Sequence, residues 1–220
     1  QTAFGLNPDA IWRYHRLDND ADRRTVLAKY LESFASHHIS PYDPSPLDRA
    51  VVDWPELVGP APAADAVIEP VIDWTAWDTA MTRAIDEYHF NSFRLTIPGM
   101  GGGSYVDRRQ PKLQGWAADT PQYQALFRGY GRAVQRHLSE RGWLDEAFVY
   151  WFDEPAPRDY SFVMDGFARL QAAAPGITRM LTEQVEAELA GGPDLWCPVT
   201  SGFNATDADR RPFQQQVEFM

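Results

Sequence analysis

The chain has 220 residues, of which 44% are hydrophobic, and this is enough material for one large domain with a substantial core. Its formal net charge of −11 argues against nucleic acid or an anionic membrane surface as a partner, because both favour a basic patch. The single cysteine, Cys197, excludes an internal disulfide and a zinc site built from several cysteines. No apolar run approaches the ~20 residues that a membrane helix needs.

The first half of the chain alternates short apolar segments with helical patterns. Apolar residues that recur every three or four positions predict helices at 23–34 and 74–88. Residues 43–70 are rich in Pro, Asp and Ala and predict a long loop or insertion. We interpret the glycine-rich segment 98–104 as a flexible loop at the rim of a sheet. Strands are expected at 2–6, 37–42 and 93–97.

The second half of the chain repeats the same alternation. Helices are expected at 121–141, which Gly142 closes, at 159–174 and at 207–220. Strands are expected at 148–152, 178–182 and 195–199.

This order predicts the α/β class, with a parallel sheet and helices packed around it. A complete (β/α)8 barrel needs about 250 residues. We therefore expect an incomplete TIM-barrel-like fold with about six β/α units, and an open doubly wound sheet is the alternative. The chain begins at Gln1 and ends inside a helical pattern, so we expect it to be a piece of a longer protein.

Two adjacent acids, Asp153 and Glu154, follow the apolar strand at 148–152 directly. Pro155 cannot donate to a sheet ladder, so the strand is expected to end there, and a proline favours an extended conformation for the residue before it. The carboxyl ends of barrel strands are where catalytic groups are found. The alternative is a turn whose acids face solvent or cap the next helix.

Two neighbouring acids suit one kind of glycoside hydrolysis better than another. The common retaining scheme takes two carboxylates from separate strands on either side of the sugar, whereas the side chains of neighbours on one strand diverge. Neighbours suit a scheme in which the 2-acetamido oxygen of the substrate attacks its own anomeric carbon. One acid then protonates the leaving oxygen, and the other holds the acetamido N–H.

The sequence YWFDEP at residues 150–155 resembles the Y-x-F-D-E-P signature of glycoside hydrolase family 123 and the related DUF4091 proteins. Residues 3–6 and 38–42 are similar to the first two barrel strands of that family, and residues 194–198 to its D-x-W-x-P strand. The resemblance implies a β-N-acetylgalactosaminidase in which Glu154 is the acid/base and Asp153 orients the acetamido group.

The resemblance also implies a domain organisation and a location. Residues 1–220 correspond to the TIM-barrel catalytic domain, without the N-terminal β-sandwich that the family usually carries and without the last barrel strands. A protein that degrades glycans is expected to be secreted or associated with the cell surface.

Five further residues are candidates for substrate binding. We expect His38 and Tyr42 at the end of the second strand, where they would bind or stack on a sugar or else hold the loop. Trp196 would form the base of a sugar subsite or else belong to the core. Glu183, which follows the fifth strand, would contact the substrate. Arg94 would pair with one of the two acids or form a plain structural ion pair.

The sequence predicts no metal and no cofactor. The pair His37 and His38 lacks a partner at metal-ligand spacing. Asp18, Asp20 and Asp22 alternate as in a calcium loop, but the required Gly and distal Glu are missing, so a solvated turn before the next helix is expected.

The leading hypothesis is therefore a hydrolase of β-linked 2-acetamido sugars, above all N-acetylgalactosamine, that uses the substrate's own acetamido group. A conventional retaining glycosidase with a nucleophile on another strand is the second hypothesis. A non-catalytic carbohydrate-binding barrel is the third.

Overall fold

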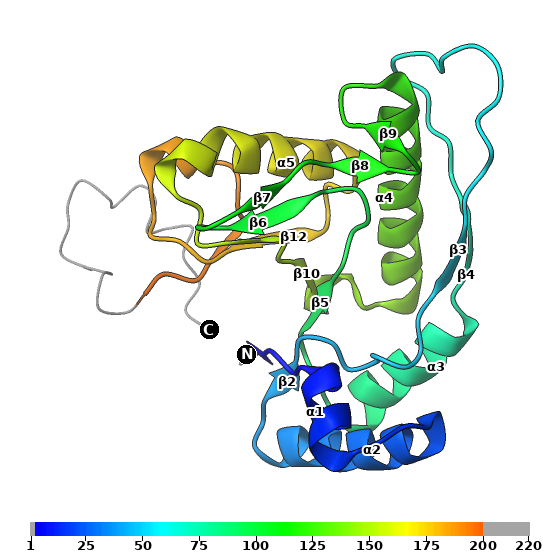
Figure 1. Cartoon of the computed structure of the whole chain (residues 1–220), viewed down its shortest axis with the longest axis vertical. Coiled ribbons are helices and arrows are strands. Elements are labelled where there is room, and N and C mark those ends of the chain that lie inside the picture. Colours follow the sequence, from blue (N-terminus) through cyan, green and yellow to red (C-terminus); the bar gives the residue numbers. More distant parts are fainter. Residues whose placement is uncertain (1–2, 200–220) are drawn as a thin grey trace. The chain divides into compact units, whose positions relative to one another are not determined.

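The computed structural model describes residues 3–199, which form two compact units (Figure 1). Unit 1 comprises residues 3–53 and 72–94, and unit 2 comprises residues 54–71 and 95–199. The expected helix at 207–220 lies outside the described residues.

Unit 1 contains a short parallel strand pair and three helices. Strands β1 (Ala3–Phe4) and β2 (Ser40–Pro41) pair with Ala3 opposite Ser40, so the first two expected strands are present but shorter. Strands β3 (Val51–Asp53) and β4 (Val71–Asp73) pair where the chain leaves and re-enters the unit. The helices are α1 (Pro8–His15), α2 (Asp20–Ser36) and α3 (Thr75–Thr82), which a π-helix at Arg83–Glu87 continues.

Helix α1 is absent from the prediction, although its start signal is in the sequence. Strand β1 ends at Phe4, and Asn7 and Pro8 then begin α1. Asn7 accepts a hydrogen bond at 3.0 Å from the N–H of Ala10, and Pro8 occupies the first turn, where its missing N–H costs nothing.

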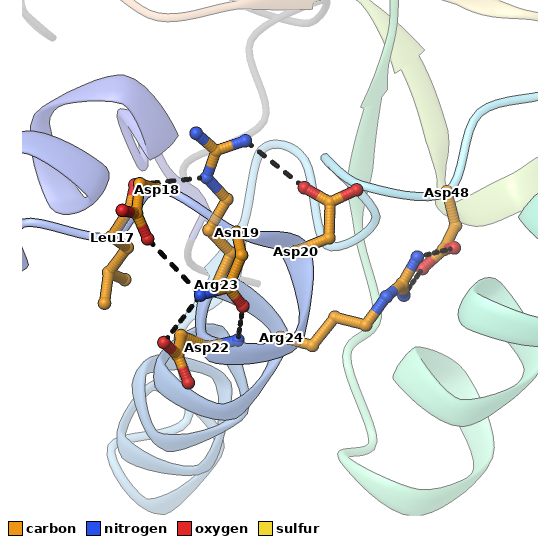
Figure 2. A network of polar contacts seen from close by, with 8 residues as sticks. All are labelled: Leu17, Asp18, Asn19, Asp20, Asp22, Arg23, Arg24 and Asp48. Atoms are coloured by element: carbon orange, nitrogen blue, oxygen red, sulfur yellow. Dashed lines mark hydrogen bonds and ion pairs between the residues drawn. The ribbon is translucent and has the colours of Figure 1, made fainter.

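The aspartate-rich turn before α2 is a helix cap. Asn19 accepts the N–H of Asp22 at 3.0 Å and donates to the Asp22 carboxylate at 2.8 Å (Figure 2). Arg23 pairs with Asp20 at 3.2 Å. The turn is exposed, as predicted, but α2 begins three residues earlier than predicted, because the Asn19 cap and the acids of the first turn stabilise the helix start.

Unit 2 is built on a parallel sheet whose strands are neighbours in chain order. Strands β10 and β12 pair in parallel, as do β12 and β13. A doubly wound sheet reverses its strand order at a switch point, and this order contains no reversal. The predicted α/β class with a parallel sheet is confirmed, whereas residues 3–199 do not close a barrel. In sheet order the strands of unit 2 are β13 (Leu195–Trp196), β12 (Thr178–Leu181) and β10 (Ala147–Val149). The fourth strand of the order, β5 (Phe93–Leu95), begins in unit 1 and ends in unit 2.

Helix α4 (Pro121–Arg141) has the predicted bounds because local signals mark both ends. Thr120 accepts the N–H of Tyr123 at 3.3 Å, and Gly142 ends the helix with φ 72°, a conformation that suits glycine. Helix α5 (Tyr160–Ala173) follows a 3-10 turn at Pro157–Asp159. No helix within residues 3–199 combines the length and apolar character needed to cross a membrane.

The predicted loop at 43–70 includes a strap, residues 54–71, that lies along α4 (Figure 1). Arg128 donates to the carbonyls of Ala64 and Ala66, and Arg136 forms two hydrogen bonds with Glu69 at 3.1 and 2.8 Å. A Cβ at Gly129 would lie 2.0 Å from the carbonyl oxygen of Ile68, so glycine is needed where the strap crosses the helix.

The glycine-rich segment after β5 is ordered, so the flexible-loop prediction is wrong for its second half. Strand β6 (Gly102–Ser104) pairs in parallel with β11 (Phe152–Asp153) and in antiparallel fashion with β7 (Arg108–Arg109). A second hairpin, β8 (Lys112–Leu113) with β9 (Trp116–Ala117), leads to α4. The glycines are compatible with a strand here because backbone approaches closely on both sides.

One ion pair ties β12 to the start of β13. Asp194 accepts from Nε and Nη2 of Arg179 at 2.8 and 2.6 Å, and from the Arg179 backbone N–H at 2.9 Å. Arg179 is 8% exposed. The Asp of the D-x-W-x-P segment therefore has a structural role.

We expect Asp194→Ala to lower the free energy of unfolding by about 2 kcal/mol, because it leaves a buried guanidinium and a strand N–H without their acceptor. Urea denaturation measures the change. Asp165→Ala, at an exposed position on α5, is the matched control and should change stability by less than about 0.5 kcal/mol. Equal effects of the two substitutions would contradict a structural role for Asp194.

Candidate active site

The strand that leads to the two acids contains an extra residue. Val149 lies opposite Arg179, and Asp153 pairs again with Thr182. Between these two pairs the chain advances four residues on the side of the acids, from 149 to 153, but only three on the β12 side, from 179 to 182. This is the arrangement of a β-bulge, which re-aims side chains and is common beside active sites. The single strand predicted at 148–152 is therefore wrong: it is divided into β10 and β11.

Two hydroxyl groups hold the carboxylate of Asp153. The Tyr150 hydroxyl donates to Oδ1, and Thr182 Oγ1 donates to the same oxygen at 3.0 Å. The two hydroxyl oxygens lie 3.2 Å apart. Both hydroxyls bind Oδ1, and among residues 3–199 none donates to Oδ2 of Asp153, whose side chain is exposed.

Thr182 contacts both members of the acid pair, because its Oγ1 also accepts the backbone N–H of Glu154 at 3.1 Å. Neither Thr182 nor Tyr150 was among the predicted site residues. Two signals were present: a hydroxyl residue at the carboxyl end of the neighbouring strand, and the tyrosine of the YWFDEP segment.

Glu154 is not extended, and the prediction made from Pro155 is wrong on this point. Its φ is 45°, which lies in the left-handed region. This conformation costs a non-glycine residue roughly 1–2 kcal/mol and persists where surrounding contacts enforce it. Thr182 holds the N–H of Glu154, and Pro155 is buried, so contacts on both sides set the backbone. Conformational outliers of this kind gather at functional sites.

Glu183 adds a third carboxyl group from the next strand end. It follows Thr182 and is half-buried. Burial raises the pKa of Glu183, and the carboxylates of Glu186 and Glu154 raise it further, against the lowering effect of a 2.7 Å hydrogen bond from the Gln184 N–H. Glu154 and Glu183, on neighbouring strand ends, are therefore close enough to interact electrostatically.

Trp196 belongs to the core, so the structure supports the second of the two alternatives given for it. Its side chain is 1% exposed and packs in a cluster with Phe152, Phe167, Leu181 and Leu189. A ring buried in this way has no face to offer a sugar. The cluster instead supports the strand ends that carry Asp153 and Thr182.

Tyr42 and Arg94 lie together in unit 1. The backbone N–H of Arg94 donates to the backbone carbonyl of Tyr42 at 2.8 Å. The guanidinium carbon of Arg94 lies 5.6 Å from the centre of the Tyr42 ring. Both residues line a cavity of about 530 Å³ together with Trp12. The predicted pairing of Arg94 with Asp153 or Glu154 joins residues of different units and stays a prediction.

His38 lies at the opposite end of β2 from Tyr42, so its predicted place is wrong. It is exposed, with φ 56°, in the turn between α2 and β2. The strand begins only at Ser40, because α2 continues to Ser36. Within residues 3–199, no three His, Cys, Asp or Glu side chains are grouped so that they could hold a metal ion.

The chain is similar to solved structures, whereas the two sequence comparisons found no match. No family model matches it, and no curated protein does. Nine solved chains match, among them a family 123 glycoside hydrolase from Clostridium perfringens, which was studied for the details of glycolipid glycan hydrolysis. The TM-score is 0.56 at 13% identity, over 98% of this chain and 41% of the other. The likeness shows a shared fold, and this chain spans about two fifths of that enzyme.

We expect Glu183→Gln to stabilise the protein at pH 8 and to leave its stability unchanged at pH 4. A carboxyl group whose pKa is raised in the folded state stabilises the fold most while it is protonated. This stabilisation is lost as the pH rises through the pKa of Glu183 in the folded protein. Glutamine stays neutral and keeps an acceptor for the Gln184 N–H. Melting temperatures at the two pH values measure the difference.

Glu188→Gln, at an exposed position in the same segment, is the matched control. A shift in melting temperature that is the same at both pH values for Glu183→Gln would contradict the prediction.

Proposed function

We propose that this chain carries the acid pair of a glycoside hydrolase that removes terminal β-linked 2-acetamido sugars, with N-acetylgalactosamine as the first candidate. One observation carries the proposal: two neighbouring carboxylates at a strand end, of which Asp153 is fixed by two hydroxyls and Glu154 is set in a left-handed conformation. The fold shared with a family 123 glycoside hydrolase supports it, as does the YWFDEP segment.

In the proposed reaction the acetamido carbonyl oxygen of the substrate attacks the anomeric carbon and displaces the leaving oxygen. Glu154 gives its proton to that oxygen as the glycosidic bond breaks. Asp153 accepts the acetamido N–H through Oδ2, while Tyr150 and Thr182 hold Oδ1. Water then adds to the anomeric carbon and loses a proton to Glu154, which opens the oxazoline ring and restores the acid.

The position of Glu183 favours a second candidate within the same class. A general acid must hold its proton near the working pH, and burial and neighbouring carboxylates raise the pKa of Glu183. Glu154 and Glu183 come from separate strand ends, as the two carboxylates of a conventional glycosidase do. In that enzyme the acetamido group of the substrate would not be needed.

Hydrolysis of chromogenic β-glycosides by the full-length gene product separates the candidates. The panel pairs N-acetylgalactosaminide and N-acetylglucosaminide with galactoside and glucoside. We expect turnover of the acetamido sugars alone, and a fall in kcat by roughly 10²–10⁴ in Glu154→Gln, because the leaving oxygen loses its acid. Asp153→Asn should also lower kcat, since it removes the carboxylate that holds the acetamido N–H.

Each other outcome points to a different function. Turnover of the galactoside or the glucoside would contradict the acetamido mechanism and favour the two-carboxylate enzyme. Sugar binding that survives Glu154→Gln, with no turnover by either protein, would favour the non-catalytic binding barrel. Glu188→Gln is the control and should behave as the wild type does.

Thr182→Val tests whether Thr182 positions the acid pair. The substitution keeps the shape of the side chain but removes the hydroxyl that contacts Asp153 and Glu154. We expect kcat to fall by about tenfold, the value of one hydrogen bond to a charged group, with KM close to that of the wild type. Thr182→Ser restores the hydroxyl and should restore kcat. A rise in KM without loss of kcat would assign Thr182 to ground-state binding instead.

A further inference from the structure

The β6–β7 hairpin places an exposed aromatic residue beside the acid pair. Ser104, the last residue of β6, lies opposite Asp153 in parallel register. Tyr105 follows Ser104 as Glu154 follows Asp153, so the two lie at the same end of neighbouring strands, which run about 4.8 Å apart. Tyr105 is 57% exposed, and Val106 beside it is 69% exposed.

Hydrogen bonds within the hairpin fix the backbone of this tip. The Ser104 N–H donates to the Asp107 carbonyl at 2.9 Å, and the Ser104 hydroxyl donates to the Asp107 carboxylate at 3.2 Å. The same hydroxyl accepts the Val106 N–H at 3.4 Å. The turn is therefore closed on itself rather than free to move as a loop.

A second set of contacts joins the hairpin to the segment that follows the acids. Arg158 donates to the Tyr105 carbonyl at 2.8 Å. Arg108 pairs at 3.3 Å with Asp159, which is 4% exposed, and its guanidinium carbon lies 5.1 Å from the centre of the Phe162 ring. The backbone of Tyr105 is thus held by the stretch of chain that begins directly after Pro155.

The glycines of β6 bring the hairpin into close contact with β11. A Cβ at Gly103 would lie 2.6 Å from the ring of Phe152 and 2.5 Å from the Asp107 carbonyl oxygen. Within the hairpin, a Cβ at Gly101, just before β6, would lie 2.3 Å from the Arg109 carbonyl oxygen. Glycine at position 103 therefore allows the close contact between the hairpin and the acid-bearing strand β11.

Single exposed apolar side chains are common on protein surfaces and need no function. Tyr105 differs because Arg158 holds its carbonyl and the hydrogen bonds of Ser104 close the turn around it, while its side chain is left exposed. A flat ring with a polar tip on a fixed backbone offers contact area at a small cost in conformational entropy. The apolar face of a pyranose ring is a partner of matching shape and chemistry.

We propose that Tyr105, with Val106 beside it, forms a subsite for the sugar on the leaving-group side of the bond that is cut. The inference rests on the proposed function, in which Glu154 protonates the leaving oxygen. The residue one strand away from Glu154 is then placed to contact the sugar that carries this oxygen. The ligand class is a neutral pyranose joined to the 2-acetamido sugar.

The test compares two substrates with the full-length gene product. One is a disaccharide of N-acetylgalactosamine β-linked to galactose, and the other is the β-fluoride of N-acetylgalactosamine, which has no leaving-group sugar. We expect Tyr105→Ala to raise KM for the disaccharide by about tenfold, the value of one stacked ring, and to leave KM for the fluoride unchanged. Tyr105→Phe keeps the ring and should keep KM. Tyr14→Ala removes another exposed tyrosine, which is 81% exposed, and is the control.

Calorimetric binding of the disaccharide, measured with the wild type and with Tyr105→Ala, separates this inference from the proposed function. Absence of turnover of both substrates would overturn the proposed function, while disaccharide binding weakened by Tyr105→Ala would still support the subsite. Disaccharide binding that is absent, or the same in both proteins, would overturn the subsite. Equal losses on the disaccharide and the fluoride would overturn it too.

Discussion

The extra residue between Val149 and Asp153 is the constraint on which the site depends. Without it, Phe152 would lie opposite Thr182, and the hydroxyl would meet a buried ring instead of a carboxylate. With it, Phe152 stays in the core at 1% exposed, and Asp153 meets Thr182 at the surface. The same shift presents Phe152 to Gly103, where only glycine leaves room for the ring. The core, the hairpin and the acid pair are thus adjusted to one another by a single inserted position.

Features set by neighbours in the chain could be predicted from the sequence. The bounds of α4 follow from Thr120, Pro121 and Gly142, each of which acts on its own turn of backbone. The acids at the end of an apolar strand were also visible, as was the alternation that gives a parallel sheet. The bulge was not, because an unbroken apolar run such as residues 148–152 carries no period from which a register shift could be detected. The left-handed Glu154 depends on a hydroxyl 28 residues away.

His38 and Trp196 show two different limits of what local sequence pattern can predict. His38 was assigned to a strand because Ile39 and Tyr42 suggest one, but helix α2 extends to Ser36 and leaves little chain before Ser40. Trp196 was ambiguous from the outset, since an aromatic residue at a strand end suits a core and a ligand equally well. Its burial is decided by Phe167 and Leu189, which come from other elements and which local pattern cannot place.

The strap on α4 has a consequence for how the chain folds while it is being synthesised. Residues 54–71 leave the ribosome well before Arg128 and Arg136, the side chains that bind them, so the strap waits without its partners. Unit 1 is interrupted by this same segment and cannot be completed until residue 94 has emerged. The strap is rich in proline and alanine, and arginines that emerge later supply its hydrogen bonds. This composition suits a segment that stays unfolded until α4 has emerged. Because the segments of the two units alternate along the chain, they also emerge alternately during synthesis.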